Sequence, residues 1–279
     1  MIVTFATTIA RQIARRARPT SALGALVLVG WAVVAALAPL AGYPVGADVD
    51  PAAASAGPSA AHWLGTDHLG RDVFWRLLLG ARAFVGPGLL ACAVSAGAGI
   101  PLGAWTGWSE GVVSAALRTG LGAISSVPRL VLVLLACSIY GNGALQLALA
   151  VGVAGVPPLA EAIRERVVRM RVEEFVLASR AHGLSDAWVL LVHLVMVASG
   201  RAIARQLLAG FGAFLGVECT LSYLGGFGVQ EPTPSWGNML AAEWGRAIGG
   251  STVAPALAIA LTLGATAAAS QLFAEVDDG

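Results

Sequence analysis

The chain contains no lysine, and charged residues of any kind make up only 12% of its 279 positions. A soluble domain carries roughly a quarter charged residues, whereas 57% of this chain is hydrophobic and its mean hydropathy is +0.77. The scarcity of charge therefore excludes an ordinary soluble domain and favours a membrane protein. The formal net charge of +1 gives no indication of a nucleic-acid partner, and we expect none.

Cysteine is also scarce. The three cysteines, Cys92, Cys137 and Cys219, all lie in apolar stretches. An odd number without metal-ligand or redox spacing argues against a disulfide framework and against a cysteine metal site. We expect all three to be small apolar packing residues.

The sequence also lacks the features of a cleavable leader. The first apolar run follows a cluster of arginines, as it does in a signal peptide, but it is too long for a signal core and has no small-residue cleavage site. We expect an uncleaved first span. The arginines are Arg11, Arg15, Arg16 and Arg18.

Long uncharged runs predict an all-α fold with six membrane-spanning helices. About 20 apolar residues are needed for one helical crossing, because no backbone group can stay unpaired in hydrocarbon. The predicted spans are Ala22–Ala41, Ala83–Trp105, Val113–Tyr140, Ala144–Ala162, Gly200–Leu224 and Thr252–Phe273. Gly141 to Gly143 separates the third from the fourth, whereas Gly97, Gly99 and Pro101 interrupt the second.

Arginine placement predicts the topology. Four arginines precede the first span, and five more follow the fourth: Arg164, Arg166, Arg169, Arg171 and Arg180. Because cytoplasmic loops are enriched in arginine, both termini are predicted to be cytoplasmic.

This topology divides the chain into five parts. Residues 1–21 form a cytoplasmic segment, and 42–82 lie on the outer face. The core of spans two to six covers 83–274 and includes a cytoplasmic loop at 164–198. A cytoplasmic tail covers 275–279.

Three stretches carry motifs: His62–Asp72, Glu174–Asp186 and Leu221–Leu240. The marked positions of the first and third are Gly65, Thr66, Asp67, Gly70, Arg71, Asp72, Pro234, Ser235, Trp236, Gly237 and Asn238. Those of the second are Phe175, Val176, Leu177, Ala178, Ser179, Arg180, Ala181, His182, Gly183, Leu184, Ser185 and Asp186.

In this order the motifs resemble the permease subunits of binding-protein-dependent ABC importers. The first and third are similar to the dipeptide, oligopeptide and nickel branch, and to the C-type member of its permease pair. The second resembles the cytoplasmic "EAA" loop, although Leu177 stands where the family has glutamate and Met196-Val197 where it has Pro-Asn. The resemblance implies the type I (MetI-like) permease fold in a bacterial inner membrane.

The same resemblance implies that residues 175–186 form a coupling helix that docks on an ATPase subunit. Independently of it, the acidic Glu173 and Glu174 favour a helix start, and Gly183 suits a left-handed helix end. The loop is therefore predicted to be a short rigid protrusion.

The outer motif between Gly65 and Asp72 allows several interpretations. We expect Asp67 and Asp72 to cap turns or to pair with Arg71 and Arg76. An enzymatic carboxylate pair is a far weaker alternative. A metal site at His62 and His68 is also weak, because two histidines rarely complete a coordination sphere.

Glu218 is the one acidic residue predicted within a span. It is either an interfacial residue held by Ser222, Tyr223 or backbone, or part of the translocation path. The stretch around Trp236 is either a docking surface for the binding protein or an interfacial aromatic belt.

The predicted function is import of dipeptides or oligopeptides by an ATP-driven transporter. No G-x-x-x-x-G-K-[ST] loop occurs, so the energy must come from a partner. We expect no catalytic residue, metal or cofactor in this chain. The resemblance implies a second permease, two ATPase subunits that use ATP and Mg²⁺, and an external solute-binding protein.

Rival functions are import of nickel, a metallophore or a sugar-like solute by the same machine, a stand-alone carrier and a membrane enzyme. A carrier predicts inverted repeats and broken helices, and the sequence indicates neither. A membrane enzyme would need convergent polar residues at one depth, which the sequence lacks.

Overall fold

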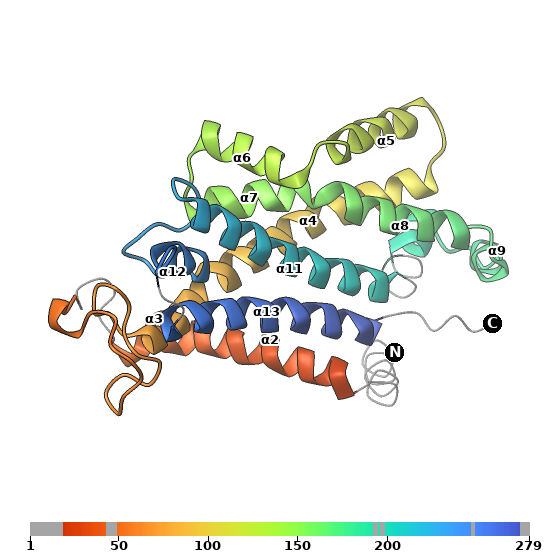
Figure 1. The fold of residues 1–279 in the computed structure, drawn as a ribbon. Coiled ribbons are helices and arrows are strands. Elements are labelled where there is room, and N and C mark those ends of the chain that lie inside the picture. Colours follow the sequence, from red (N-terminus) through yellow and green to blue (C-terminus); the bar gives the residue numbers. More distant parts are fainter. Residues whose placement is uncertain (1–18, 43–48, 192–194, 196–198, 247–248, 274–279) are drawn as a thin grey trace.

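The computed structural model describes residues 19–42, 49–191, 195, 199–246 and 249–273. Helices α2, α13, α11, α4 and α8 lie side by side, with α3 and α12 at one end and α9 at the other (Figure 1). The helices are α2 (Pro19–Leu37), η1 (Ala38–Ala41), η2 (Pro51–Ala53), α3 (Val73–Gly80), α4 (Arg82–Trp108), α5 (Val112–Ser125), α6 (Arg129–Tyr140), α7 (Ala144–Ala154), α8 (Val156–Met170), α9 (Glu174–Ala181), α10 (Asp186–Trp188), α11 (Gly200–Leu224), α12 (Trp236–Ala242), α13 (Gly250–Ser270) and η4 (Gln271–Phe273).

Five helical segments within the described residues are long and apolar enough to cross a membrane. They are Pro19–Ala41, Val73–Trp108, Ala144–Met170, Gly200–Leu224 and Gly250–Phe273. The fifth predicted span coincides with α11. The all-α prediction agrees with this part of the chain, where the β-type pairing recorded is a single bridge between Thr66 and Asp72.

The third predicted span, Val113–Tyr140, is wrong as one continuous helix. It consists of α5 and α6, which meet at a bend of 88° and are long and apolar enough to cross a membrane only when taken together. Pro128 explains the break, because proline disfavours helical backbone at the residue before it and has no N–H to donate. The expectation that no span is broken was therefore incorrect here.

Helix α4 differs from its prediction in the opposite way. It runs unbroken from Arg82 to Trp108 through Gly97, Gly99 and Pro101, which were expected to interrupt it. Neighbouring helices and local backbone adjustments let membrane helices tolerate such residues.

Several predicted boundaries also shift. Helix α2 already begins at Pro19, inside the expected cytoplasmic segment 1–21. The outer segment gives way to α3 at Val73, and α8 continues to Met170, inside the expected loop 164–198. Residues 1–18 and the predicted tail at 275–279 lie outside the described residues.

Small residues bring the central helices into close contact. A Cβ atom on Gly103 of α4 would lie 2.3 Å from the Ala160 carbonyl oxygen of α8. One on Gly107, four residues later, would lie 2.9 Å from the Arg164 carbonyl oxygen. Glycines at this spacing let two helix backbones approach closely, which is how membrane helices associate without a hydrophobic driving force.

Candidate functional site

The outer segment folds around Asp67. Its Oδ1 accepts hydrogen bonds from the backbone N–H groups of Leu69 (2.9 Å) and Arg71 (3.0 Å). Gly70, with φ +79°, closes this turn against Asp50, where a Cβ would lie 1.9 Å from the carbonyl oxygen. Asp67 therefore holds a turn, as expected for this motif.

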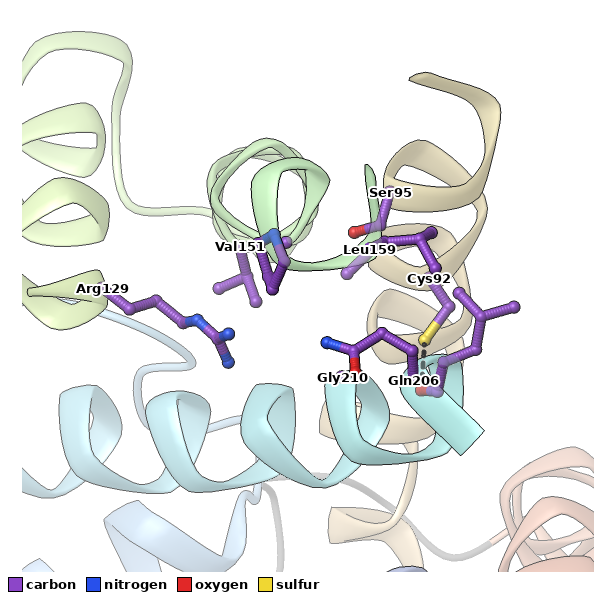
Figure 2. Close-up of a pocket in the computed structure, with 11 residues that line it drawn as sticks. Cys92, Ser95, Arg129, Val151, Leu159, Gln206 and Gly210 are labelled. Atoms are coloured by element: carbon purple, nitrogen blue, oxygen red, sulfur yellow. Dashed lines mark hydrogen bonds between the residues drawn. The ribbon is translucent and has the colours of Figure 1, made fainter. Parts of the chain in front are cut away.

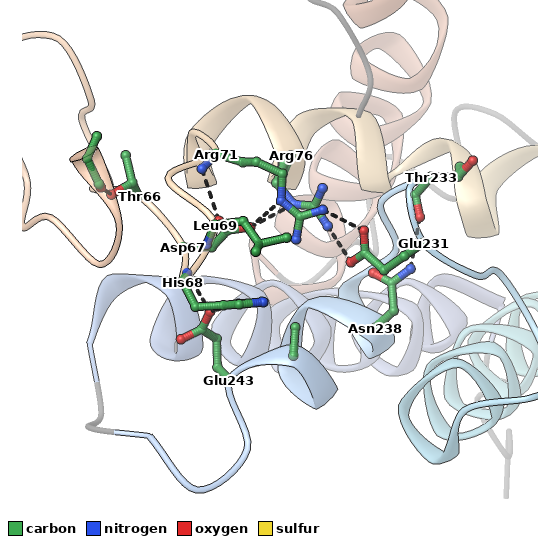
Figure 3. Close-up of polar contacts among 12 residues, drawn as sticks. Thr66, Asp67, His68, Leu69, Arg71, Arg76, Glu231, Thr233, Asn238 and Glu243 are labelled. Atoms are coloured by element: carbon green, nitrogen blue, oxygen red, sulfur yellow. Dashed lines mark hydrogen bonds and ion pairs between the residues drawn. The ribbon is translucent and has the colours of Figure 1, made fainter. Parts of the chain in front are cut away.

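A carboxylate far along the chain completes the arginine pairing (Figure 3). Glu231 accepts from Arg71 Nη1 and from Arg76 Nη2, both at 2.7 Å, while Arg71 Nε donates to Asp67 Oδ2 at 2.7 Å. We call Asp67, Arg71, Arg76 and Glu231 the outer clasp. It joins the segment before α3 to the loop before α12.

The electrostatics of the clasp favour charged Arg71. Burial opposes the charge, but the hydrogen bonds and charges of Glu231 and Asp67 outweigh it and raise the pKa of Arg71 above its ordinary value. A raised folded pKa contributes stability below the unfolded pKa, and this stability is lost only as the pH rises through the folded value. The ion pairs of Arg71 are thus insensitive to pH near neutrality.

Each outer histidine binds a carboxylate. His62 Nδ1 lies 2.8 Å from Asp72 Oδ2, and His68 Nδ1 lies 3.0 Å from Glu243 Oε1. Asp72 also accepts from the Trp75 N–H and so caps α3, in line with the first of the two roles expected of it. Its ion-pair partner is His62 and not an arginine. Within the described ranges no group of three potential ligands forms, which gives the metal alternative no support.

The third motif packs directly beneath the clasp. Ser235 and Asn238 form a reciprocal capping box at the start of α12, and Asn238 Nδ2 donates to the Thr233 carbonyl at 2.8 Å. Trp236 is 1% exposed. The aromatic-belt interpretation is therefore wrong for Trp236, whereas Trp244 is 79% exposed.

Close packing beside Trp236 predicts a specific sensitivity. A Cβ on Gly237 would lie 2.3 Å from the Cys219 carbonyl oxygen, a backbone atom that cannot move aside. We expect Gly237→Ala to force α12 from α11 and to lower the unfolding free energy by about 1–3 kcal/mol, measured as thermal unfolding in detergent. Gly216→Ala on α11 is the control, because no atom lies within 4 Å of its added Cβ. Equal stability of the two variants would contradict this packing.

Glu218 is buried in the same region. Ser222, one turn later, donates to its Oε1 at 2.7 Å. The bond from Ser222 agrees with the prediction that this residue holds Glu218. Glu218 is fully buried, however, and not interfacial as that prediction also stated. It lines neither cavity described below, so the pathway role stays a prediction.

The predicted coupling segment forms a protrusion at the other end of the molecule (Figure 1). Helix α9 ends before Gly183, whose φ is +80°, and α10 begins at Asp186. Arg180 Nε donates to Asp186 Oδ1 at 2.9 Å across the turn, and its guanidinium lies 4.7 Å from the centre of the Trp108 ring at the end of α4. The turn is therefore braced against a membrane helix.

Val176 anchors this protrusion, and several apolar side chains face outward. Val176 belongs to α9 and its side chain is buried. Leu177, the departure from the family pattern, is exposed on α9, as are Leu184 in the turn and Trp188 on α10. Met196 and Val197, the other departures, lie outside the described residues.

Two cavities lie along one face of α4. The outer one, about 510 Å³, includes Arg82, Ala83, Pro87 and Gln230 in its wall. The inner one, about 20 Å³, includes Arg129 and, from α4, Ala91 and Ser95. Four of the α4 members, Ala83, Pro87, Ala91 and Ser95, recur every four residues, which places them in one row along the helix.

Sequence reasoning missed Glu231, Glu243, Arg129 and Gln206. Both glutamates lie next to or within the third motif, but nothing in their spacing indicates partners more than 150 residues away. Arg129 was assigned to the interior of a continuous span, and the adjacent Pro128 was the available signal.

The chain matches the model of one protein family over residues 99–275, namely the binding-protein-dependent transport system inner membrane component. The chain belongs to this family. This confirms the resemblance and makes the chain a multi-pass transport component of the inner membrane.

The chain is also similar to individual permeases of known name. The chain is 29% identical over 218 residues to the dipeptide transport system permease protein DppC of Alkalihalophilus pseudofirmus, covering 78% of this chain and 71% of that protein. It is 31% identical over 209 residues to the glutathione transport system permease protein GsiD of Pectobacterium atrosepticum, covering 74% and 69%. The GsiD protein of Escherichia coli O157:H7 is 30% identical over 209 residues.

Proposed function

We propose that this chain is a permease subunit of an ATP-driven importer of small peptides. The observation that carries the proposal is its similarity to permeases named for dipeptides and glutathione, over about three quarters of its length. The relatives' names favour peptide over nickel. A stand-alone carrier would have broken membrane helices, and α5 and α6 form one such broken span. The family match nevertheless favours a transporter subunit over a stand-alone carrier.

The two ends of the molecule have different partners in this proposal. The α9 protrusion, the N-terminal end of α2 and the C-terminal end of α13 face the cytoplasm. The arginines of α8 and α9 support this orientation. There, exposed Leu177 and Leu184 contact an ATPase subunit. The clasp end faces outward and receives the solute-binding protein. A second related permease completes the pathway, and two ATPase subunits use ATP and Mg²⁺.

A rigid protrusion suits mechanical coupling. The Arg180–Asp186 ion pair and the Arg180–Trp108 contact tie the Gly183 turn to α4. The same helix α4 lines both cavities. Movement of the protrusion on ATP binding is thus transmitted to the helix that borders the proposed path.

The first test is co-purification of the tagged chain in mild detergent from its own membranes. We expect the wild type to retain an ATPase and a second permease. Gly183→Trp distorts a left-handed turn and Leu184→Asp places charge in the contact, so each should reduce ATPase recovery at least tenfold, since about 1.4 kcal/mol of lost contact suffices.

Val112→Asp is the matched control, because Val112 is an exposed apolar residue at the start of α5, outside the protrusion. Its ATPase recovery should equal that of the wild type. Recovery of the wild-type chain alone, while a known complex survives the same detergent, would refute the transporter assignment.

A further inference from the structure

The inner cavity holds an arginine without a carboxylate partner. Arg129 of α6 and Gln206 of α11 point toward one another across the cavity (Figure 2). Among the described residues, neither side chain has a recorded hydrogen bond or ion pair. By contrast, Arg164 on the nearby α8 donates to Glu161 at 2.9 Å.

The other polar groups of the cavity already have partners. Ser95 Oγ donates to the Gly152 carbonyl at 2.7 Å, and Cys92 Sγ lies 3.4 Å from the Leu207 carbonyl oxygen. The guanidinium of Arg129 and the amide of Gln206 are therefore the groups left to bind a ligand.

Two helices place this cavity near the middle of the membrane. Arg129 lies 11 residues before Tyr140, the clasp-side end of α6, which is about 16 Å along a helix. Cys92 lies 10 residues after Arg82, the clasp-side end of α4, or about 15 Å. Because the hydrocarbon core is about 30 Å thick, both estimates lie close to its centre.

An arginine at this depth is costly and marks a function or a missing partner. Its guanidinium presents parallel N–H donors that match the two oxygens of a carboxylate, and the amide N–H₂ of Gln206 adds a further donor. The cavity itself is small, about 20 Å³. The site suits the end of a molecule whose remainder lies outside the cavity.

We propose that Arg129 and Gln206 bind a carboxylate of the cargo midway across the membrane. This inference rests on the proposed peptide cargo, because every unmodified peptide has a terminal carboxylate. The outer cavity of about 510 Å³ lies on the same row of α4 and has the volume of a small-ligand site. A peptide held there reaches the inner cavity by moving along α4.

The test uses the complete transporter with its own partners, reconstituted in liposomes. Import of a dipeptide with a free C-terminus is compared with import of the same dipeptide as its C-terminal amide. We expect Arg129→Gln to lower the free-acid to amide import ratio roughly tenfold or more, since a hydrogen bond to a charged group is lost. The wild type and the Arg129→Gln variant receive cargo from the same binding protein, so the preference of that protein for one dipeptide form affects both ratios equally.

Arg118→Gln is the matched control. Arg118 is an exposed arginine of α5 that lines neither cavity, and its ratio should equal that of the wild type. Gln206→Leu keeps the guanidinium and should shift the ratio in the same direction by a smaller factor. It serves as the second variant where Arg129→Gln assembles poorly.

Three outcomes overturn the inference. The first is an unchanged ratio in Arg129→Gln with import of both substrates at the wild-type rate, and the second is an unchanged ratio because import of both falls equally. The third is loss of the second permease on purification, which would show that Arg129 pairs with a carboxylate of that subunit. Wild-type complexes that import no peptide overturn the proposed function itself. Peptide import with an unchanged ratio overturns this inference alone.

Discussion

Replacing Trp236 by alanine is expected to lower the unfolding free energy by about 3–5 kcal/mol, the range for removing a fully buried large aromatic side chain. Its ring centre lies 4.8 Å from that of Trp31 on α2 and 4.7 Å from that of Phe84 on α4. Its Nε1 donates to the Leu77 carbonyl of α3 at 2.9 Å. One side chain thus joins α12 to three other helices, and its loss leaves both a void and an unpaired carbonyl.

The measurement is thermal unfolding of the detergent-solubilised protein, with accessibility of a cysteine introduced on α2 as a second readout. Trp244→Ala is the control, because Trp244 belongs to the same outer region and is 79% exposed. Its effect should stay below about 1 kcal/mol. Equal destabilisation by the two substitutions would show that Trp236 is not the core of this region.

Glu231→Ala is expected to lower the unfolding free energy by about 2–3 kcal/mol and the midpoint of thermal unfolding by roughly 4–12 °C. The substitution leaves the buried guanidinium groups of Arg71 and Arg76 sharing one carboxylate, Asp67. Removing one member of a buried pair typically costs more. Glu231 is 39% exposed, however, so water replaces part of the lost interaction.

The control is Glu161→Ala, which breaks the exposed i,i+3 pair with Arg164 on α8. A pair of this kind contributes about 0.2–1 kcal/mol, so its unfolding midpoint should barely move. Limited proteolysis of the segment 49–72 should accelerate in Glu231→Ala only, because the clasp holds that segment to the α12 loop. An effect of Glu231→Ala no larger than the control would contradict a stabilising clasp.

Both predictions concern one structural unit that the sequence presents as two. The contacts between the two parts join residues more than 150 positions apart: Glu231 binds Arg71 and Arg76, and Trp236 binds the carbonyl of Leu77. In the proposed function this unit presents a rigid outer surface to the binding protein. A rigid surface suits docking, because less freedom is lost on association.

Local patterns were sufficient for the parts that depend on neighbouring residues. Span five was predicted with the bounds of α11, and the Gly183 turn has the predicted left-handed backbone. Both follow from hydrophobicity and backbone sterics within a few residues. Asp67 was likewise predicted to hold a turn, and the N–H groups that donate to it, those of Leu69 and Arg71, are its neighbours in sequence.

The prediction was weakest where a feature depends on several helices. The 88° bend between α5 and α6 was missed although Pro128 lies at it, and Gly97 to Pro101 were expected to break α4 but do not. Whether glycine or proline breaks a membrane helix depends on what packs beside it. A Cβ added to Gly99, for example, would lie 3.2 Å from the Leu159 side chain, so α8 packs directly against this stretch of α4.

The sequence by itself determined the class of this protein, because apolar length, arginine placement and motif order are properties of the chain read in one dimension. It also determined the α9 protrusion with its Gly183 turn. Only the tertiary structure decided which charges pair and which stay open: Glu231 completes the clasp, whereas Arg129 faces Gln206 across a cavity without a carboxylate. Charge pairing acts over a few ångströms in space, and sequence separation carries almost no information about that distance.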